Sequence, residues 1–175
     1  MKNMKVIFAF CIWLVAATTW AGDADDQSTL TKVGDAAPEF KVTTLDGKTF
    51  DLKEARGKVV LINFFATWCG PCMQEMPHVQ DEIWNQFKDK SFVMMAIDRE
   101  ETQQVVAEFE KKRAFPFPIA CDPKREVYGK FATQYIPRNV LVGADGKIVF
   151  QSMGYSSEEF EKLVTTIRTE LAKVH

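Results

Sequence analysis

A strand of the kind buried in a sheet runs into a helix near the middle of this chain, and two cysteines stand at the junction. The strand is KVVLINFF, residues 58–65, a continuous apolar run rich in β-branched residues. Such a run is expected of a central strand covered on both faces. From Gly70 to about Lys90 the pattern becomes helical, with Pro77 expected to kink the helix. Its apolar stripe consists of Met76, Val79, Ile83 and Phe87.

Strand and helix patterns on either side predict an α/β fold with a mixed sheet. Residues 40–52 are expected to form a hairpin about Asp46-Gly47, and residues 52–58 can carry a short helical turn. Asp122-Pro123 has the features of a helix N-cap followed by proline, which predicts a helix to about Thr133. The remaining elements are a strand at 91–98, a helix at 101–113, an extended piece at 115–121, two strands joined by a turn at 144–147, and a last helix that opens on a capping box between Ser156 and Glu159.

The first 21 residues have the layout of a secretory signal peptide. Lys2 and Lys5 precede an apolar run of about 15 residues, and Thr19-Trp20-Ala21 ends it as a cleavage pattern. The run is shorter than the roughly 20 residues that cross a membrane. We therefore predict export to the periplasm, with an uncleaved membrane anchor as the alternative. Cys11 lies within the run and would leave with the signal.

Removing residues 1–21 leaves 154 residues of the 175, a single-domain length. We expect a flexible lead-in at 22–37 and one domain at 38–175. The whole chain has a net charge of −2, which becomes −4 without Lys2 and Lys5. This balance indicates neither nucleic acid nor an anionic membrane as a partner, and we expect a monomer.

Three cysteines remain after the signal: Cys69, Cys72 and Cys121. Disulfides persist outside the cytosol, but three cysteines are too few for a disulfide scaffold. The adjacent pair therefore indicates chemistry. It could bind a metal, form a static staple, or pass electrons.

The position of the pair favours thiol–disulfide exchange. Cys69 falls at the helix start, where unpaired N–H groups favour its thiolate, and Cys72 follows on the same face. Gly70 allows another backbone to approach closely, and Pro71 fits the first turn without loss of a hydrogen bond. The thiolate is the nucleophile of such exchange.

The motif Trp68-Cys69-Gly70-Pro71-Cys72 after a buried strand resembles the thioredoxin superfamily, and its context resembles the exported TlpA/ResA-type branch. The resemblance covers about residues 33–173. It includes the hairpin, NFFATWCGPC, the following Glu75-Met76-Pro77, a helical insertion, and Tyr135-Ile136-Pro137 before NVLVGADGKIV. It implies a thioredoxin-like fold whose central mixed sheet is flanked by helices.

The resemblance also implies roles for individual residues. Cys69 would be the attacking nucleophile, and Cys72 the resolving cysteine. Pro137 would be a cis-proline facing the disulfide, with an ordinary turn proline as the alternative. Ile136 would offer backbone hydrogen bonds to a substrate, and Trp68 would form an apolar docking patch with Pro71 and Ile136.

Glu75 is the third candidate for the chemistry. Thioredoxin keeps a buried aspartate six residues before its first cysteine, where this chain has Asn63. Glu75 matches an acidic residue of ResA-like proteins and lies one turn after Cys72. We hypothesise that it tunes the pKa values of the cysteines and exchanges protons with Cys72. The alternative is an exposed glutamate that complements the helix dipole.

Other functions find less support. Zinc needs more ligands than one such pair. Met73 and Met76 with His78 suggest copper, but His78 falls on another side of the helix, so we expect no metal and no cofactor. A peroxidase of the peroxiredoxin type would have threonine or serine three residues before its cysteine, where Ala66 stands. A non-catalytic binding module with a static disulfide is also an alternative. Cys121 is expected as a small buried residue at a strand end, or else in a regulatory disulfide.

The direction of electron flow follows only by resemblance. The Gly-Pro between the cysteines is that of thioredoxin, which implies a reductase of disulfides in exported proteins. Apocytochrome c and misoxidised proteins are the substrates that the resemblance implies, with a membrane thiol donor as the electron source. An oxidase or isomerase that uses the same cysteines is the alternative.

Overall fold

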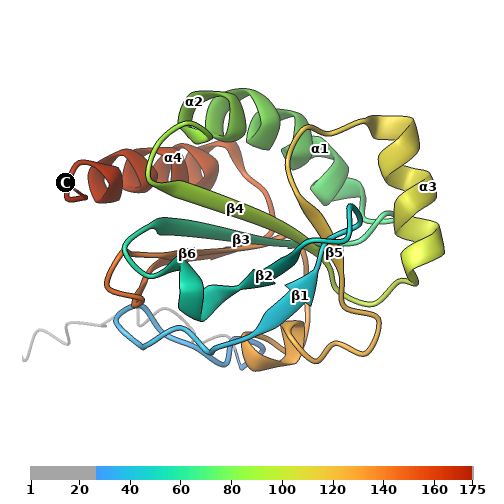
Figure 1. Ribbon diagram of the computed structural model, residues 1–175, viewed down its shortest axis with the longest axis horizontal. Coiled ribbons are helices and arrows are strands. Elements are labelled where there is room, and N and C mark those ends of the chain that lie inside the picture. The colour runs from blue at the N-terminus through green and yellow to red at the C-terminus, as the bar shows by residue number, and fades with distance from the viewer. Residues whose placement is uncertain (1–26, 175) are drawn as a thin grey trace, which may run out of the picture.

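β3 (Val59–Phe65) lies at the centre of a five-stranded sheet, and all seven of its residues are buried. The computed structural model describes residues 27–174 (Figure 1). The strand order is β5 (Ile119–Cys121), β4 (Phe92–Asp98), β3, β6 (Arg138–Val142) and β7 (Ile148–Met153). β3, β4 and β5 run parallel, whereas β6 is antiparallel to both β3 and β7. The predicted mixed sheet is confirmed.

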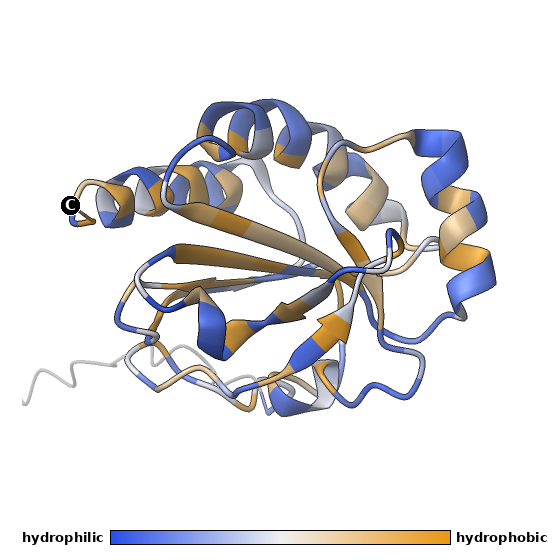
Figure 2. Cartoon of the chain, viewed as in Figure 1, coloured by the Kyte–Doolittle hydropathy of each residue, from blue (hydrophilic) through white to orange (hydrophobic). Residues whose placement is uncertain are grey.

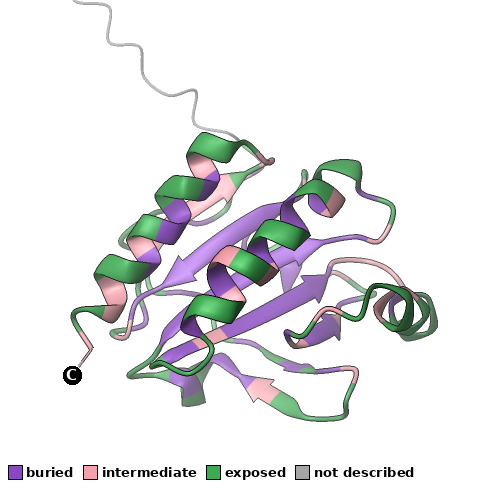
Figure 3. Ribbon diagram, turned by 90° about the horizontal axis from the view of Figure 1, so that it is seen from above, coloured by how far each residue is buried: buried purple, intermediate pink, exposed green. Residues whose placement is uncertain are grey.

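Helices cover one face of this sheet, and the N-terminal hairpin covers the other. The first layer contains α1 (Gly70–His78), a π-helical segment η2 (Val79–Trp84), α2 (Asn85–Phe87) and α4 (Ser157–Leu171). The second contains β1 (Lys41–Thr43), β2 (Thr49–Asp51) and the 3-10 turns η1 (Leu52–Ala55) and η3 (Tyr128–Lys130). α3 (Gln103–Arg113) lies between β4 and β5 in sequence and at the sheet edge in space. The helices expose their outer faces, while the strands between the layers are buried (Figure 3).

The two cores follow from the alternation of side chains along β3. Leu61 and Phe65 belong to the core under the helices, and Ile62 and Phe64 to the core under the hairpin. Phe64 packs edge-on against Tyr128 at 5.2 Å between ring centroids. Apolar residues accordingly concentrate in the sheet and on the inner helix surfaces (Figure 2).

The predicted helix after Asp122 is wrong. Only the short η3 forms there, because Arg125 adopts a left-handed backbone conformation with φ 58° that interrupts a helix. Asp122 still caps backbone donors: its carboxylate accepts hydrogen bonds from the N–H groups of Glu126, Val127 and Tyr128 at 2.7–2.9 Å.

The helix that follows the cysteines runs from Gly70 with Pro77 inside it. Proline has no N–H to donate to the preceding turn, and two residues later the hydrogen-bond pattern changes to the π-helical η2. Near the proline expected to kink the helix, the chain thus stays helical and changes its hydrogen-bond pattern. The stripe residues Met76, Val79, Ile83 and Phe87 are all buried. At α4, Ser156 accepts from the Glu159 N–H, as the capping box predicts.

The segment 28–37, part of the expected lead-in, contacts the domain. Arg138 donates hydrogen bonds to the hydroxyls of Ser28 and Thr29, and the Thr31 hydroxyl donates a hydrogen bond to Gln151 Oε1. Residues 1–26, with the expected signal peptide at 1–21, lie outside the described residues. Between residues 27 and 174, no helix has the length and apolar character needed to span a membrane.

Candidate active site

Cys69 and Cys72 form a disulfide at the point where β3 passes into α1. Cys69 is the N-cap of α1 in an extended backbone conformation, and its Sγ accepts a hydrogen bond from the Cys72 N–H at 3.2 Å. The S–S bond is 2.06 Å long. Cys72 is fully buried, whereas Cys69 is 3% exposed and borders a groove. Only the Cys69 sulfur is therefore placed for attack on, or by, a sulfur of another protein. The helix N-terminus stabilises negative charge at this position.

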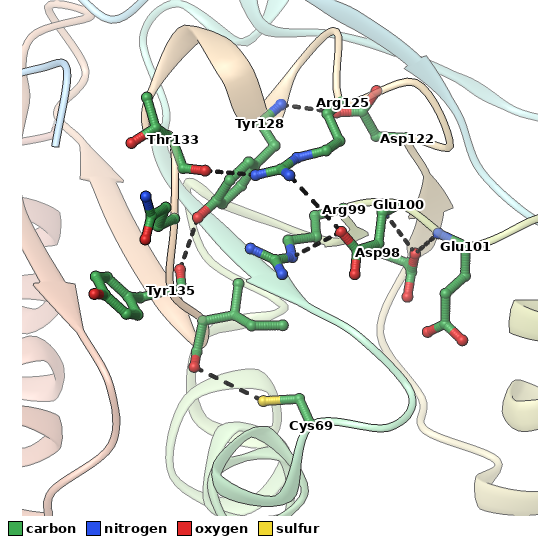
Figure 4. Close-up of polar contacts among 12 residues, drawn as sticks. Cys69, Asp98, Arg99, Glu100, Glu101, Asp122, Arg125, Tyr128, Thr133 and Tyr135 are labelled. Carbon is green, nitrogen blue, oxygen red and sulfur yellow. Dashed lines mark hydrogen bonds and ion pairs between the residues drawn. The ribbon is translucent and has the colours of Figure 1, made fainter. Parts of the chain in front are cut away.

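The Ile136–Pro137 peptide bond is cis and lies against the disulfide. The Ile136 carbonyl oxygen is 3.8 Å from Cys69 Sγ. In the disulfide this sulfur carries no hydrogen, so the contact becomes a hydrogen bond only in the thiol form. In Figure 4 a dashed line from the Cys69 sulfur marks this contact. Ile136 lies on the wall of the groove, as a backbone that binds a substrate strand would require.

Glu75 is buried beneath the disulfide, one helical turn after Cys72, with 2% of its surface exposed. The alternative of an exposed, dipole-complementing glutamate is thereby wrong. The Nδ2 groups of Asn139 and Asn63 donate to its two oxygens at 2.6 and 3.0 Å. Burial raises the pKa of Glu75 to about 7, although both amide hydrogen bonds act to lower it. This carboxyl can therefore bind and release a proton near neutral pH.

The groove beside Cys69 has a volume of about 400 Å³. Its floor and rim include the predicted docking residues Trp68, Gly70, Pro71 and Ile136. Trp68 and Tyr135 are 60% and 56% exposed and both line the groove, so large apolar surface beside the sulfur is open to a partner. The remaining lining residues are Arg99, Arg125, Thr133 and Gln134.

An acidic pair at the end of β4 supports the loop that carries Cys69. Glu101 accepts hydrogen bonds from the Thr67 N–H at 2.6 Å and from the Thr67 hydroxyl at 2.8 Å. Asp98 accepts from the N–H groups of Glu100 and Glu101. Burial raises the pKa of Asp98 to about 7, and the neighbouring Glu101 carboxyl contributes a smaller part of this increase.

The residues weighed for other chemistry lie apart from this arrangement. His78 is exposed, pairs with Glu82 at 2.7 Å and stacks on Tyr155, while Met76 is a core residue. Cys121 ends β5 as a free, half-buried thiol, and burial raises its pKa to about 11. Within residues 27–174, no three His, Cys, Asp or Glu side chains gather as metal ligands.

Asn139 and the two arginines of the groove were not predicted from the sequence. Asn139 stands directly opposite Asn63 in the antiparallel pairing of β3 with β6. A polar residue in each of two mostly apolar strands was the available signal, but it depends on knowing the register. Arg99 and Arg125 have no local signal, since they meet only through the arrangement of two loops.

Comparison with known proteins places the chain among thiol-disulfide oxidoreductases. The model of the AhpC/TSA family matches residues 33–151. The Thiol-disulfide oxidoreductase ResA of Bacillus anthracis is 34% identical over 164 residues, which cover 91% of this chain and 94% of that protein. ResA of Bacillus subtilis is 30% identical over 125 residues, covering 71% of this chain and 69% of that protein.

Solved structures share the fold. A candidate protein disulfide isomerase from Bacteroides thetaiotaomicron has a TM-score of 0.80 and 38% identity, over 83% of this chain and 93% of that one. A candidate thiol:disulfide interchange protein DsbE from Chlorobium tepidum has a TM-score of 0.71 and 29% identity, over 80% of this chain and 98% of that one.

Proposed function

Given that this chain belongs to the AhpC/TSA family and is a thiol-disulfide oxidoreductase of the ResA type, we propose that it reduces disulfides in exported proteins. The observation that carries the proposal is the Cys69–Cys72 disulfide at the N-terminus of α1, with Cys69 open to a groove and Cys72 buried behind it.

The reaction consists of two exchanges between sulfurs. The Cys69 thiolate attacks one sulfur of the substrate disulfide, a mixed disulfide forms, and the other substrate sulfur leaves as a thiolate. The Cys72 thiolate then attacks Cys69 and releases the substrate sulfur. Two electrons have passed from the enzyme dithiol to the substrate, which is now a dithiol, and the enzyme holds the Cys69–Cys72 disulfide.

The residues around the cysteine pair each have a role in these two exchange steps. The α1 N-terminus stabilises the Cys69 thiolate. Trp68, Gly70, Pro71 and Ile136 contact the substrate segment, with Pro137 setting the backbone of that wall. Glu75 accepts the proton that Cys72 loses before the second attack, since its pKa of about 7 suits that transfer.

A reductase must be reduced back to the dithiol form after each catalytic cycle. A membrane thiol donor that repeats the same exchange in reverse would supply these electrons. Export rests on the signal pattern of residues 1–21, and apocytochrome c is one substrate that fits an exported reductase. N-terminal sequencing of the protein from cells tests the signal pattern: a chain that starts at Gly22 supports a cleaved signal, and one retained at the membrane with Met1 intact supports the uncleaved anchor instead.

The direction of transfer is tested by equilibrating the mature protein with glutathione buffers and measuring the fraction oxidised. We expect a reduction potential of about −270 mV, the value for thioredoxin, together with reduction of insulin in the presence of dithiothreitol. A potential near the about −120 mV of DsbA would instead identify an oxidase with the same cysteines. Cys69→Ser should abolish turnover, and Cys72→Ser should stop it at the mixed disulfide.

A further inference from the structure

Two arginines line the groove beside Cys69. Arg99 follows the end of β4, and Arg125 lies on the loop after β5. Apart from Cys69 and Tyr135, these are the only ionisable side chains among the described residues that line the groove. In Figure 4 the Arg99 guanidinium lies between Arg125 and Cys69, so the positive charge extends toward the reactive sulfur.

The guanidinium groups are held by contacts that leave their charge in place. Arg99 lies over the rings of Trp68 and Tyr128 at 5.7 and 5.3 Å, and Arg125 lies over Tyr128 at 5.1 Å. Arg125 Nη2 also donates to the Thr133 carbonyl oxygen at 2.6 Å. Aromatic faces and a neutral carbonyl position a cation without neutralising it. Two oriented cations therefore face a groove that has apolar sides.

A single carboxylate, that of Glu100, forms ion pairs with both arginines. A Glu100 carboxylate oxygen, Oε2, lies 3.5 Å from Arg99 Nε and 3.9 Å from Arg125 Nη1. Within the described residues, Arg99 Nε is buried without a hydrogen-bond partner. Glu101, the next acid in the chain, is turned to Thr67 instead. The group of Arg99, Arg125 and Glu100 thus keeps an excess positive charge beside the groove.

We propose that the groove selects disulfides whose flanking residues are acidic. An acidic peptide segment of the substrate lies in the groove, its carboxylate binds at Arg99 and Arg125, and its disulfide sulfur reaches Cys69. Guanidinium matches carboxylate in charge and in hydrogen-bond geometry, while Trp68 packs on the apolar part of the segment. This inference rests on the proposed function, because it names the substrate class of the same site.

The test uses two synthetic peptides with one intramolecular disulfide, identical except that glutamates beside the cysteines in one are glutamines in the other. The protein is kept in its dithiol form by dithiothreitol, the uncatalysed reduction by dithiothreitol is subtracted, and kcat/KM is compared for the two peptides. We expect the acidic peptide to be preferred by about fivefold, the effect of a partly exposed ion pair, and the preference to fall as salt is added.

Variants with opposite expected effects separate charge from structure. Arg125→Gln should bring the preference close to one, and Arg125→Lys should retain most of it. Glu100→Gln removes the shared carboxylate and should increase the preference. Lys130→Gln, at an exposed position that does not line the groove, removes the same charge as Arg125→Gln and should leave the preference unchanged.

The outcomes distinguish this inference from the proposed function. Loss of the Thr133 contact alone would slow both peptides equally in Arg125→Gln, so an unchanged preference in that variant overturns the inference. Equal kcat/KM for both peptides in the unmodified protein also overturns it, while the reductase assignment stands. If neither peptide is reduced, both this inference and the proposed reductase function are overturned.

Discussion

Asn139 and Glu75, 64 residues apart in the chain, are joined in the interior by a hydrogen bond of 2.6 Å from Asn139 Nδ2 to Glu75 Oε1. Asn63 donates through its Nδ2 to the other Glu75 oxygen and, at 2.8 Å, to Asn139 Oδ1. Two uncharged amides therefore hold a carboxyl group whose pKa burial raises to about 7. The arrangement places a proton acceptor one helical turn beyond the buried cysteine.

Glu75→Gln should change the thiol reactivity of the reduced protein. Above about pH 7 the Glu75 carboxylate opposes a second negative charge nearby. Without it, we expect the midpoint of the pH curve for alkylation by iodoacetamide to move down by about one unit. Glu82→Gln, on an exposed residue further along the same helical segment, is the matched control and should leave the curve in place. Superimposable curves for Glu75→Gln and the unmodified protein would remove this role from Glu75.

Glu75 should also set part of the pH dependence of stability in the oxidised protein, where neither cysteine of the disulfide titrates. Its pKa is about 7 in the folded protein against an ordinary 4.5, so between these values the folded state binds more protons than the unfolded state. The free energy of unfolding must then fall as pH rises from about 4.5 to 7 and stay level above, by about 3 kcal/mol in total. Urea denaturation across this range measures the slope.

Asp98 contributes a slope of the same sign, because its pKa is also raised to about 7. Glu75→Gln should therefore flatten the profile only in part, and Glu75→Gln with Asp98→Asn should flatten it further. A slope in Glu75→Gln as steep as that of the unmodified protein would mean that Glu75 does not titrate in this window.

Asn139→Ala should destabilise the protein more at high pH than at low pH. At pH 8 the variant leaves a buried Glu75 carboxylate oxygen without its closest donor, a loss of about 1–3 kcal/mol in the free energy of unfolding. At pH 5 Glu75 is protonated, so the loss should be smaller. Asn85→Ala, on the exposed side of α2, controls for removal of an amide. Equal losses at the two pH values would contradict an effect through the charge of Glu75.

Periodicity in the sequence was enough to predict the sheet, the layers and the place of the cysteine pair. The run at β3, the hairpin about Asp46-Gly47 and the capping box at Ser156 are each local signals with a physical cause, and the structure contains all three. The helix expected after Asp122 failed because the left-handed conformation of Arg125 is imposed by its surroundings and leaves no mark in the residue type.

From the residues alone the site was predictable only where the motif is contiguous; the distant Ile136-Pro137 was predicted through the resemblance, and the structure places it against Cys69. Cys69 and Cys72 are neighbours in sequence, and Glu75 follows them on the same helix. Asn139 reaches Glu75 through the pairing of β6 with β3, a register that local patterns do not specify. The two amides that hold Glu75 come together through the same pairing, so its burial has no local signal and the sequence alone is compatible with an exposed glutamate.

Glu101 should stabilise the loop before Cys69 through its two hydrogen bonds with Thr67, one to the N–H and one to the hydroxyl. Glu101→Ala leaves the Thr67 N–H without this acceptor, and we expect a loss of about 1–3 kcal/mol in the free energy of unfolding at pH 8. Thr67→Val keeps the N–H bond and should lose only about 1 kcal/mol. Because both variants remove the hydroxyl bond, the double variant should lose less than the sum of the two. Glu108→Ala, on an exposed residue of α3, should have little effect. Strictly additive losses, measured by urea denaturation, would show that Glu101 and Thr67 act independently and that the loop carrying Cys69 is held in place by other contacts.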